Sequence, residues 1–432
     1  MTLRSSEPTL LFTLRAVWTL LFGIGLLQAA NGLQGSLLGI RAEAEGFDSA
    51  AIGLIMSGFY IGLLVGSLWT PSAVRLVGHV RVFAAMSAIA SVSILLHALF
   101  VDEISWWIIR CVTGFCYAGI LVVTESWLND RAPEETRGQV LALYMAVSFG
   151  GVAGSQMLLN LASSEEATLY MVVSILISLA VVPLLLRSTP LPAVESGQPI
   201  SIKELVSASP LGIFGTLIAG FANGTVFGMG AVYARSAGFS VADTALFMAL
   251  LTVGAAILQW PIGRLSDRFD RRMVMTIVAA LSVATSLAAT TVNSIDSIYP
   301  IVLILMTGGL SLSIHSLSLA YTNSHLKPEQ MIGASSALVM ILGAGSVVGP
   351  IVTGAAISLF GPPGFFLWLA SCHVSFVIFA LWRMSKRASL PSDQQMPFVS
   401  APFQGSEIST AYTDETVVLP ESGIARPIAG SK

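Results

Sequence analysis

Two stretches of the sequence resemble one another: FGIGLLQAANG at Phe22–Gly32 and FGTLIAGFANG at Phe214–Gly224. They superpose when the first half of the chain is shifted by 192 residues, and the same shift places Gly46 on Gly238. Both stretches are apolar and have the length of a helical segment. Self-similarity at one fixed offset indicates a duplicated architecture. The sequence therefore predicts two homologous halves.

A second pair of segments repeats at a slightly different spacing. With a shift of 195 residues, Pro133-Glu134 falls on Pro328-Glu329 and Gly138 falls on Gly333. Parallel six-helix repeats, related by an axis normal to a membrane, are typical of transporters in which two bundles rock about a central site. The repeat favours that architecture over a channel or a receptor.

Composition indicates a membrane protein. Hydrophobic residues make up 54% of the 432 residues, charged residues make up only 10%, and the mean hydropathy is +0.80. Soluble domains carry about 25% charged residues, so the outer surface of this fold is expected to face lipid. The net charge of -3 argues against nucleic-acid binding, and the three cysteines, Cys111, Cys116 and Cys372, lie inside apolar runs and imply no disulfide framework.

Twelve apolar segments are long enough to cross the hydrocarbon layer, which takes about 20 helical residues. The first could pass for a cleaved signal peptide, but its match with the segment at 214–224 predicts an uncleaved span. The predicted spans are 16–40, 50–70, 82–101, 105–128, 138–161, 167–186, 210–233, 241–262, 273–293, 299–321, 333–359 and 364–384. We expect an all-α membrane protein of twelve transmembrane helices, arranged as two pseudo-symmetric six-helix bundles.

Four regions follow from these spans. Residues 1–187 form the first bundle and residues 210–387 form the second, with a more polar cytoplasmic linker at 188–209. Residues 388–432 are rich in Ser, Thr, Pro and acidic residues, so we expect a disordered cytoplasmic tail.

The distribution of Lys and Arg predicts the orientation. Of the 21 Lys and Arg residues, 18 fall on the side that holds both termini, Arg41 and Arg235 fall on the other side, and Arg110 falls within a span. Basic residues accumulate in cytoplasmic loops. We therefore expect both termini in the cytoplasm and the protein in the cytoplasmic (inner) membrane.

A motif follows the eighth span. The stretch QWPIGRLSDRFDRR at Gln259–Arg272 resembles the Gly-x-x-x-Asp-Arg-x-Gly-Arg-Arg loop of the major facilitator superfamily, with Asp270 in place of the later glycine. The resemblance implies a twelve-helix permease with a conformational latch at this loop. A basic turn between two helices is the alternative interpretation. The latch residues are Gly263, Asp267, Arg268 and Arg271.

The matching position in the first half carries Arg75, where the family pattern has Asp. We hypothesise that the charge relation is inverted there. Arg75 would then belong to the latch and pair with an acid at the inner end of the fourth span, Glu125 or Asp130.

The fourth span carries two further resemblances. Arg110–Gly114 resembles the superfamily's Arg-x-x-x-Gly element, and Val122–Ser126 resembles the YcaD-like branch of bacterial permeases. The resemblance covers residues 16–384 and implies solute transport without naming a substrate.

Two ionisable residues of the same span are functional candidates. Arg110 lies about six residues into its helix, roughly 9 Å below the surface, and a charge at that depth costs at least about 2 to 3 kcal/mol unless it faces water, substrate or a partner. It is interpreted either as a substrate or coupling residue or as a structural charge. Glu125 is interpreted either as a helix-end acid that pairs with Arg75 or as a proton carrier.

Polar residues elsewhere in the spans are weaker candidates. Gln28, Asn31 and Gln34 span a face of about 120° on the first helix, and Asn223 repeats Asn31 on the seventh. They either line a polar cavity or join helices by hydrogen bonds. His315, in the tenth span, has a side chain whose unperturbed pKa near 6.5 suits proton exchange, although a packing role is the common one.

The sequence predicts a secondary active transporter of a small organic solute that works by alternating access with proton coupling. Antiport is favoured because Gly345, Gly349 and Pro350 look like an antiporter element. A facilitative uniporter and a transporter-derived sensor are the alternatives. We expect no enzyme activity, cofactor, metal or nucleic-acid partner; the partners are the solute, protons and the lipid bilayer, and the sequence leaves the oligomeric state open.

Overall fold

The computed structural model describes residues 10–131, 137–185, 201–386, 395, 396 and 398. Within these residues the secondary structure is helical and contains no strand. Helices are expected because lipid offers the backbone no hydrogen-bond partner, and a helix satisfies its own amide groups.

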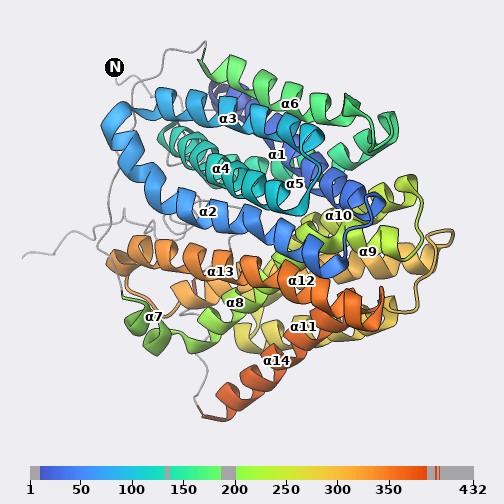
Figure 1. The fold of residues 1–432 in the computed structure, drawn as a ribbon. Helices are drawn as coiled ribbons and strands as arrows, with labels where there is room; N and C mark the ends of the chain where they lie inside the picture. Colours follow the sequence, from blue (N-terminus) through green and yellow to red (C-terminus); the bar gives the residue numbers. More distant parts are fainter. Residues whose placement is uncertain (1–9, 132–136, 186–200, 387–394, 397, 399–432) are drawn as a thin grey trace, which may run out of the picture.

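The first half contains six long helices, shown from blue to green in Figure 1. They are α1 (Leu10–Ala44), α2 (Ser49–Val77), α3 (His79–Leu99), α4 (Glu103–Arg131), α5 (Arg137–Ser155) with its 3₁₀ extension η2 (Gln156–Leu161), and α6 (Ala167–Leu185).

The second half repeats this arrangement after the short helix α7 (Ile202–Ala208). Its seventh span is continuous, and within it a π-helical turn separates two α-helices. The elements are α8 (Pro210–Gly224), η3 (Thr225–Met229), α9 (Gly230–Ser236), α10 (Val241–Arg268), α11 (Arg271–Ala289), α12 (Ile298–Asn323), α13 (Pro328–Phe360) and α14 (Gly364–Lys386).

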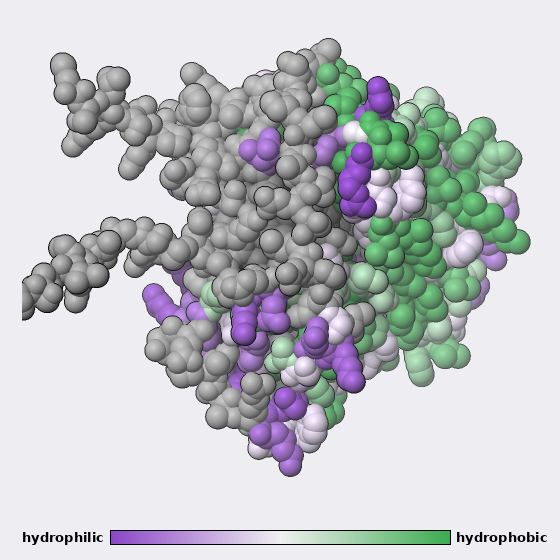
Figure 2. All heavy atoms as spheres, turned by 90° about the vertical axis from the view of Figure 1, so that its left-hand side faces the viewer, coloured by the Kyte–Doolittle hydropathy of each residue, from purple (hydrophilic) through white to green (hydrophobic). Residues whose placement is uncertain are grey.

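The twelve-span architecture is confirmed. Ten helical segments of the described residues are long and apolar enough to cross a membrane, and α1 and α6 complete the set. The C-terminal ends of α2, α4, α10 and α14 carry basic residues and lie on one side of the bundle. We call this the basic side; it lies at the left of Figure 1. Figure 2 looks onto that side and shows hydrophilic residues on the near face and hydrophobic residues on the flank.

The repeat extends to the backbone of the turns. Gly46 and Gly238 both adopt positive φ, at 77° and 86°, which an L side chain rarely tolerates. Each precedes a capping residue: Asp48 accepts a hydrogen bond from the amide of Ala50, and Ser240 accepts one from the amide of Asp243. The two halves therefore start their second helices in the same way.

Glycines bring pairs of helices into backbone contact at equivalent positions of the two halves. A Cβ atom on Gly62 of α2 would overlap the carbonyl oxygen of Cys111, and one on Gly254 of α10 would overlap that of Leu305. Small residues allow such approach in membrane bundles, where van der Waals packing drives association. The pairs α2/α4 and α10/α12 are consequently rigid centres of the two bundles.

Gly114 provides a test of this packing. Its added Cβ would overlap the carbonyl oxygen of Phe59, so α2 and α4 must separate if the site is to hold alanine. We expect Gly114→Ala to lower the melting temperature of the purified protein, at a cost of about 1 to 3 kcal/mol. The control is Gly150→Ala in α5, where no atom lies within 4 Å of the added Cβ. Equal melting temperatures for the two variants would contradict the packing argument.

Candidate functional site

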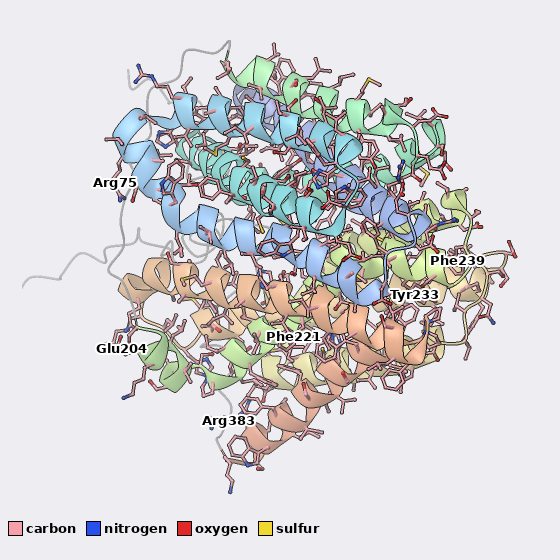
Figure 3. All side chains as sticks on the ribbon, in the orientation of Figure 1. Arg75, Glu204, Phe221, Tyr233, Phe239 and Arg383 are labelled. Atoms are coloured by element: carbon pink, nitrogen blue, oxygen red, sulfur yellow. The ribbon has the colours of Figure 1, made fainter. Side chains whose placement is uncertain are left out.

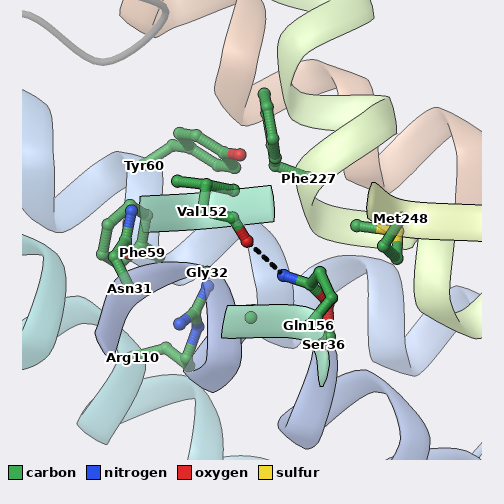
Figure 4. Close-up of a pocket in the computed structure, with 11 residues that line it drawn as sticks. Asn31, Gly32, Ser36, Phe59, Tyr60, Arg110, Val152, Gln156, Phe227 and Met248 are labelled. Atoms are coloured by element: carbon green, nitrogen blue, oxygen red, sulfur yellow. Dashed lines mark hydrogen bonds between the residues drawn. The ribbon is translucent and has the colours of Figure 1, made fainter. Parts of the chain in front are cut away.

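A small cavity of ≈ 20 Å³ lies between the two halves. Figure 4 shows that its lining comes from both halves, so the site exists only where they meet. The lining residues are Asn31, Gly32, Gly35 and Ser36 of α1, Phe59 and Tyr60 of α2, Arg110 of α4, Val152 of α5, Gln156 of η2, Phe227 of η3 and Met248 of α10.

Arg110 supplies the positive charge of the cavity. Its side chain is buried, with 4% of the residue exposed, and the guanidinium carbon lies 4.6 Å from the centroid of the Phe59 ring. The Nε atom has no hydrogen-bond partner, and no carboxylate of the described residues forms an ion pair with this guanidinium.

Neutral polar groups complete the wall. The Ser36 hydroxyl donates to Oε1 of Gln156 at 2.6 Å, and Nε2 of Gln156 donates to the carbonyl of Val152 at 3.1 Å. These bonds connect α1 to the end of the fifth span and hold Gln156 in place. Asn31 lines the same cavity.

Two of the six residues predicted to line the cavity do so. Asn31 and Arg110 line the cavity, whereas the other four lie elsewhere. Gln28 and Gln34 are buried without hydrogen-bond partners for their amide groups, and Gln28 packs beside Gly151 of α5. Asn223 donates to Ser346 of α13 at 3.4 Å. His315 is buried in α12, and its Nδ1 has no partner.

Sequence reasoning missed several residues of the cavity. Ser36, Tyr60, Phe227 and Met248 stand in apolar helices, and no pattern separates them from residues that face lipid or a neighbouring helix. A helical projection from Asn31 does not find Ser36 either, because five residues place it about 140° away around the helix axis.

Glu125 lies apart from the cavity, toward the basic end of α4. It is buried, with 3% of the residue exposed, and its Oε1 accepts a hydrogen bond from the Tyr144 hydroxyl at 2.5 Å. The contact joins α4 to α5. Among the described residues, Glu125 is the one Asp or Glu residue that is buried.

The residues of the predicted latch lie at and beside the turn between α10 and α11. The Arg271 side chain is 1% exposed, pairs with Asp267 at 3.0 Å and donates to the carbonyl of Ala320 at 2.9 Å. It therefore joins the turn between α10 and α11 to α12. Gly263 is buried, and Arg268 is exposed. Asp270, which departs from the family pattern, caps α11 by accepting from the amide of Arg272 at 3.0 Å.

The hypothesis for Arg75 is not supported by the geometry. Arg75 is exposed at the end of α2, as Figure 3 shows, and donates to the Ser72 hydroxyl at 2.9 Å. Glu125 is buried between α4 and α5, and Asp130 is exposed without an ion pair to Arg75. The pairing fails because the carboxylate turns into the bundle while the guanidinium points outward.

The two sides of the cavity differ in how tightly the halves meet. On the side opposite the basic side, Ser358 at the end of α13 donates to the carboxylate of Asp48 at 3.0 Å. Arg235 lies 3.9 Å from Glu43 on the same side. A Cβ on Gly53 of α2 would overlap the carbonyl oxygen of Pro350 in α13. This side is closed.

On the basic side the halves enclose a larger groove of ≈ 550 Å³ between α5 and α10, here called the α5/α10 groove. It is lined by Gly138, Leu141, Ala142, Met145, Ala146 and Phe149 of α5, by Ala256, Gln259, Trp260, Gly263, Arg264 and Asp267 of α10, and by Phe398. The arrangement is that of a bundle pair closed on one side and opened on the other.

A family model described as Major Facilitator Superfamily matches residues 20–314 and 212–415 of the chain. The chain belongs to this superfamily. The predicted resemblance is confirmed, and the chain is a multi-pass membrane protein of a transporter family.

Individual proteins agree with this assignment. The "Uncharacterized MFS-type transporter YcaD" of Escherichia fergusonii is 28% identical over 380 residues, which cover 87% of this chain and 98% of that protein. Among solved structures, a mutant of the nucleoside transporter NupG has a TM-score of 0.72 at 16% identity, covering 84% of this chain and 98% of that one. A bacterial homologue of the human lysosomal transporter Spinster has a TM-score of 0.65 at 14% identity, covering 95% and 100%.

Proposed function

We propose that this protein is a secondary active transporter that moves a small organic solute by alternating access between its two halves. One observation carries the proposal: a cavity lined by both halves holds a buried cation, and it lies between a closed side and an open groove. Rocking of two rigid bundles about such a site exposes it to each side in turn.

We further propose that transport is coupled to protons, that antiport is the favoured direction, and that both termini lie in the cytoplasm. Glu125 supports the first point, because a buried carboxyl group within a span is a site where a proton can be bound and released. Gly345 and Gly349 support an antiporter element in α13, because a Cβ atom added to either would overlap backbone atoms of α8. The excess of basic residues on one side supports the orientation.

Two alternatives remain distinct from this proposal. A facilitative uniporter would use the same cavity and the same rocking motion without a proton site. A membrane sensor derived from a transporter would bind the solute without net transport. His315 is a second candidate for the proton site, although it lies in α12 outside the cavity lining.

Alternating access is tested by closing the contact between Asp48 and Ser358 covalently. In a background without Cys111, Cys116 and Cys372, we introduce Asp48→Cys and Ser358→Cys, with Ser36→Cys as a reporter in the cavity. An impermeant thiol reagent should label the reporter from both faces before oxidation. After oxidation it should label from the basic side only, because the opposite side can no longer open.

The control carries Asp48→Cys and the reporter but retains Ser358, so that oxidation forms no bridge. Access to the reporter from one face only before oxidation would contradict alternating access. Undiminished labelling from the opposite side after verified cross-linking would contradict it as well.

Proton coupling is tested in reconstituted vesicles with a panel of organic solutes, with and without an imposed pH gradient. We expect the gradient to change the uptake rate of the transported solute. Glu125→Gln should abolish this response while solute exchange in the absence of a gradient continues, because the amide binds no proton. The control is Glu103→Gln, at the exposed start of the same helix. Wild-type uptake rates that do not change with the pH gradient would support the uniporter.

A further inference from the structure

Arg110 differs from the other buried arginines of the described residues in having no acid beside it. Arg271 pairs with Asp267 and Arg272 pairs with Asp270, each at 3.0 Å. The Arg110 guanidinium instead lies over the Phe59 ring, and its Nε lacks a hydrogen-bond partner. A buried charge is costly unless it is paired and hydrogen-bonded. Among the described residues, the cavity wall supplies this guanidinium with no negative charge.

The surroundings of Arg110 restrict what that partner is. The wall offers neutral polar groups from Asn31, Ser36 and Gln156, and apolar surface from Phe227 and Met248. None of these groups neutralises a positive charge. A guanidinium matches the geometry of a carboxylate, to which it donates two parallel hydrogen bonds. The apolar wall suits a hydrocarbon or aromatic body attached to that group.

We propose that the cavity binds small amphipathic organic monocarboxylates and that Arg110 is the counter-ion of their carboxylate. This inference rests on the proposed transport function, because it assigns the substrate class of the same cavity. A single guanidinium balances a single negative charge, so a monocarboxylate fits the charge of the site better than a dianion.

Ligand binding is measured by the shift in melting temperature of the purified full-length protein, which needs no transport. The added compounds are benzoate with its neutral counterpart benzamide, hexanoate with hexanamide, and phenyl phosphate. We expect each carboxylate to raise the melting temperature more than its amide does. Arg110→Gln should weaken benzoate binding about tenfold or more and remove this preference, and Arg110→Lys should retain part of it.

The ligand-free variants separate a binding role from a structural one. Removing an uncompensated buried charge should raise the melting temperature of ligand-free Arg110→Gln. Arg271→Gln should lower it, because that change breaks the bonds to Asp267 and Ala320. The exposed Arg81→Gln should leave both melting temperature and ligand preference unchanged.

Three results would overturn the assignment. They are a panel in which no carboxylate exceeds its amide, a fall in melting temperature for ligand-free Arg110→Gln, and a response to phenyl phosphate alone. Because binding is measured without transport, its failure is distinguishable from a failure of the reporter experiment on alternating access.

A second observation concerns a segment beyond α14 that contacts the latch. The Met396 amide donates to the Ser324 hydroxyl at 3.1 Å, and its carbonyl accepts from Arg271 at 2.7 Å. The Phe398 amide donates to Asp267 at 2.8 Å. The segment therefore binds through its backbone to both charged residues of the latch ion pair.

The Phe398 ring occupies the α5/α10 groove beside Gly263, where an added Cβ would overlap it. Alternating access requires this groove to close when the opposite side opens. A phenyl ring lodged between α5 and α10 obstructs that closure. We propose that Met396 and Phe398 belong to an autoinhibitory strap that holds the basic side open until it leaves the latch.

The Ser36→Cys reporter tests the strap without a known solute. Phe398→Ala should speed labelling from the side opposite the basic side severalfold, because the groove closes more readily. Gly263→Ala should have the same effect by displacing the ring, and the two changes together should add little to either. The control is Phe403→Ala, an aromatic residue of the same tail that lies outside the described residues.

An unchanged or slower labelling rate in Phe398→Ala would overturn the strap. An equal acceleration by Phe403→Ala would overturn it too, because the effect would not depend on the groove. A wild-type reporter that never becomes accessible from the opposite side would count against alternating access instead, so the two failures are distinguishable.

Discussion

Gly62 and Gly114 let the backbones of α2 and α4 touch, and this contact determines where the charged residue of the cavity lies. Phe59 and Tyr60 stand less than one turn before Gly62, and Arg110 stands about one turn before Gly114. The two helices cannot slide or rotate without separating each glycine from the backbone of the partner helix. The guanidinium is therefore held over the Phe59 ring by helix packing, and its position does not depend on an acidic partner. A rigid support of this kind lets the cavity present a charge before any ligand arrives.

The two halves share a backbone plan but divide the chemistry between them. With the repeat shift of 195 residues, Arg110 falls on Leu305 and Glu125 falls on Ala320, so the second half carries neither charge. With the shift of 192 residues, Asp267 of the latch falls on Arg75, which is exposed and bonded only within its own helix. Duplication preserved the turns and the close helix pairs, which packing requires. The charges diverged, since each is needed at only one place between the halves.

The fold could be predicted from the sequence because each span must satisfy its backbone within lipid, and this leaves a long apolar signal. The cavity could be predicted only where a charge or amide interrupts that signal. Arg110 and Asn31 were found in this way, but Tyr60 and Phe227 look like any other apolar helical residues. Gln28 shows the converse error. A spacing of three residues rotates successive side chains by about 60°, which carries Gln28 from the face of Asn31 toward Gly151 of α5.

The π-helical turn η3 places one residue more in a turn than an α-helix does, within the span that contributes Phe227 to the cavity. Reversion to ordinary helix geometry would advance one end of the span by a single residue, a rotation of about 100°. The Phe227 ring would then leave the cavity wall without any movement of the bundles. A change of hydrogen-bond register confined to five residues is thus enough to alter the shape of the cavity. This change lies in the half that contributes no charge to the cavity.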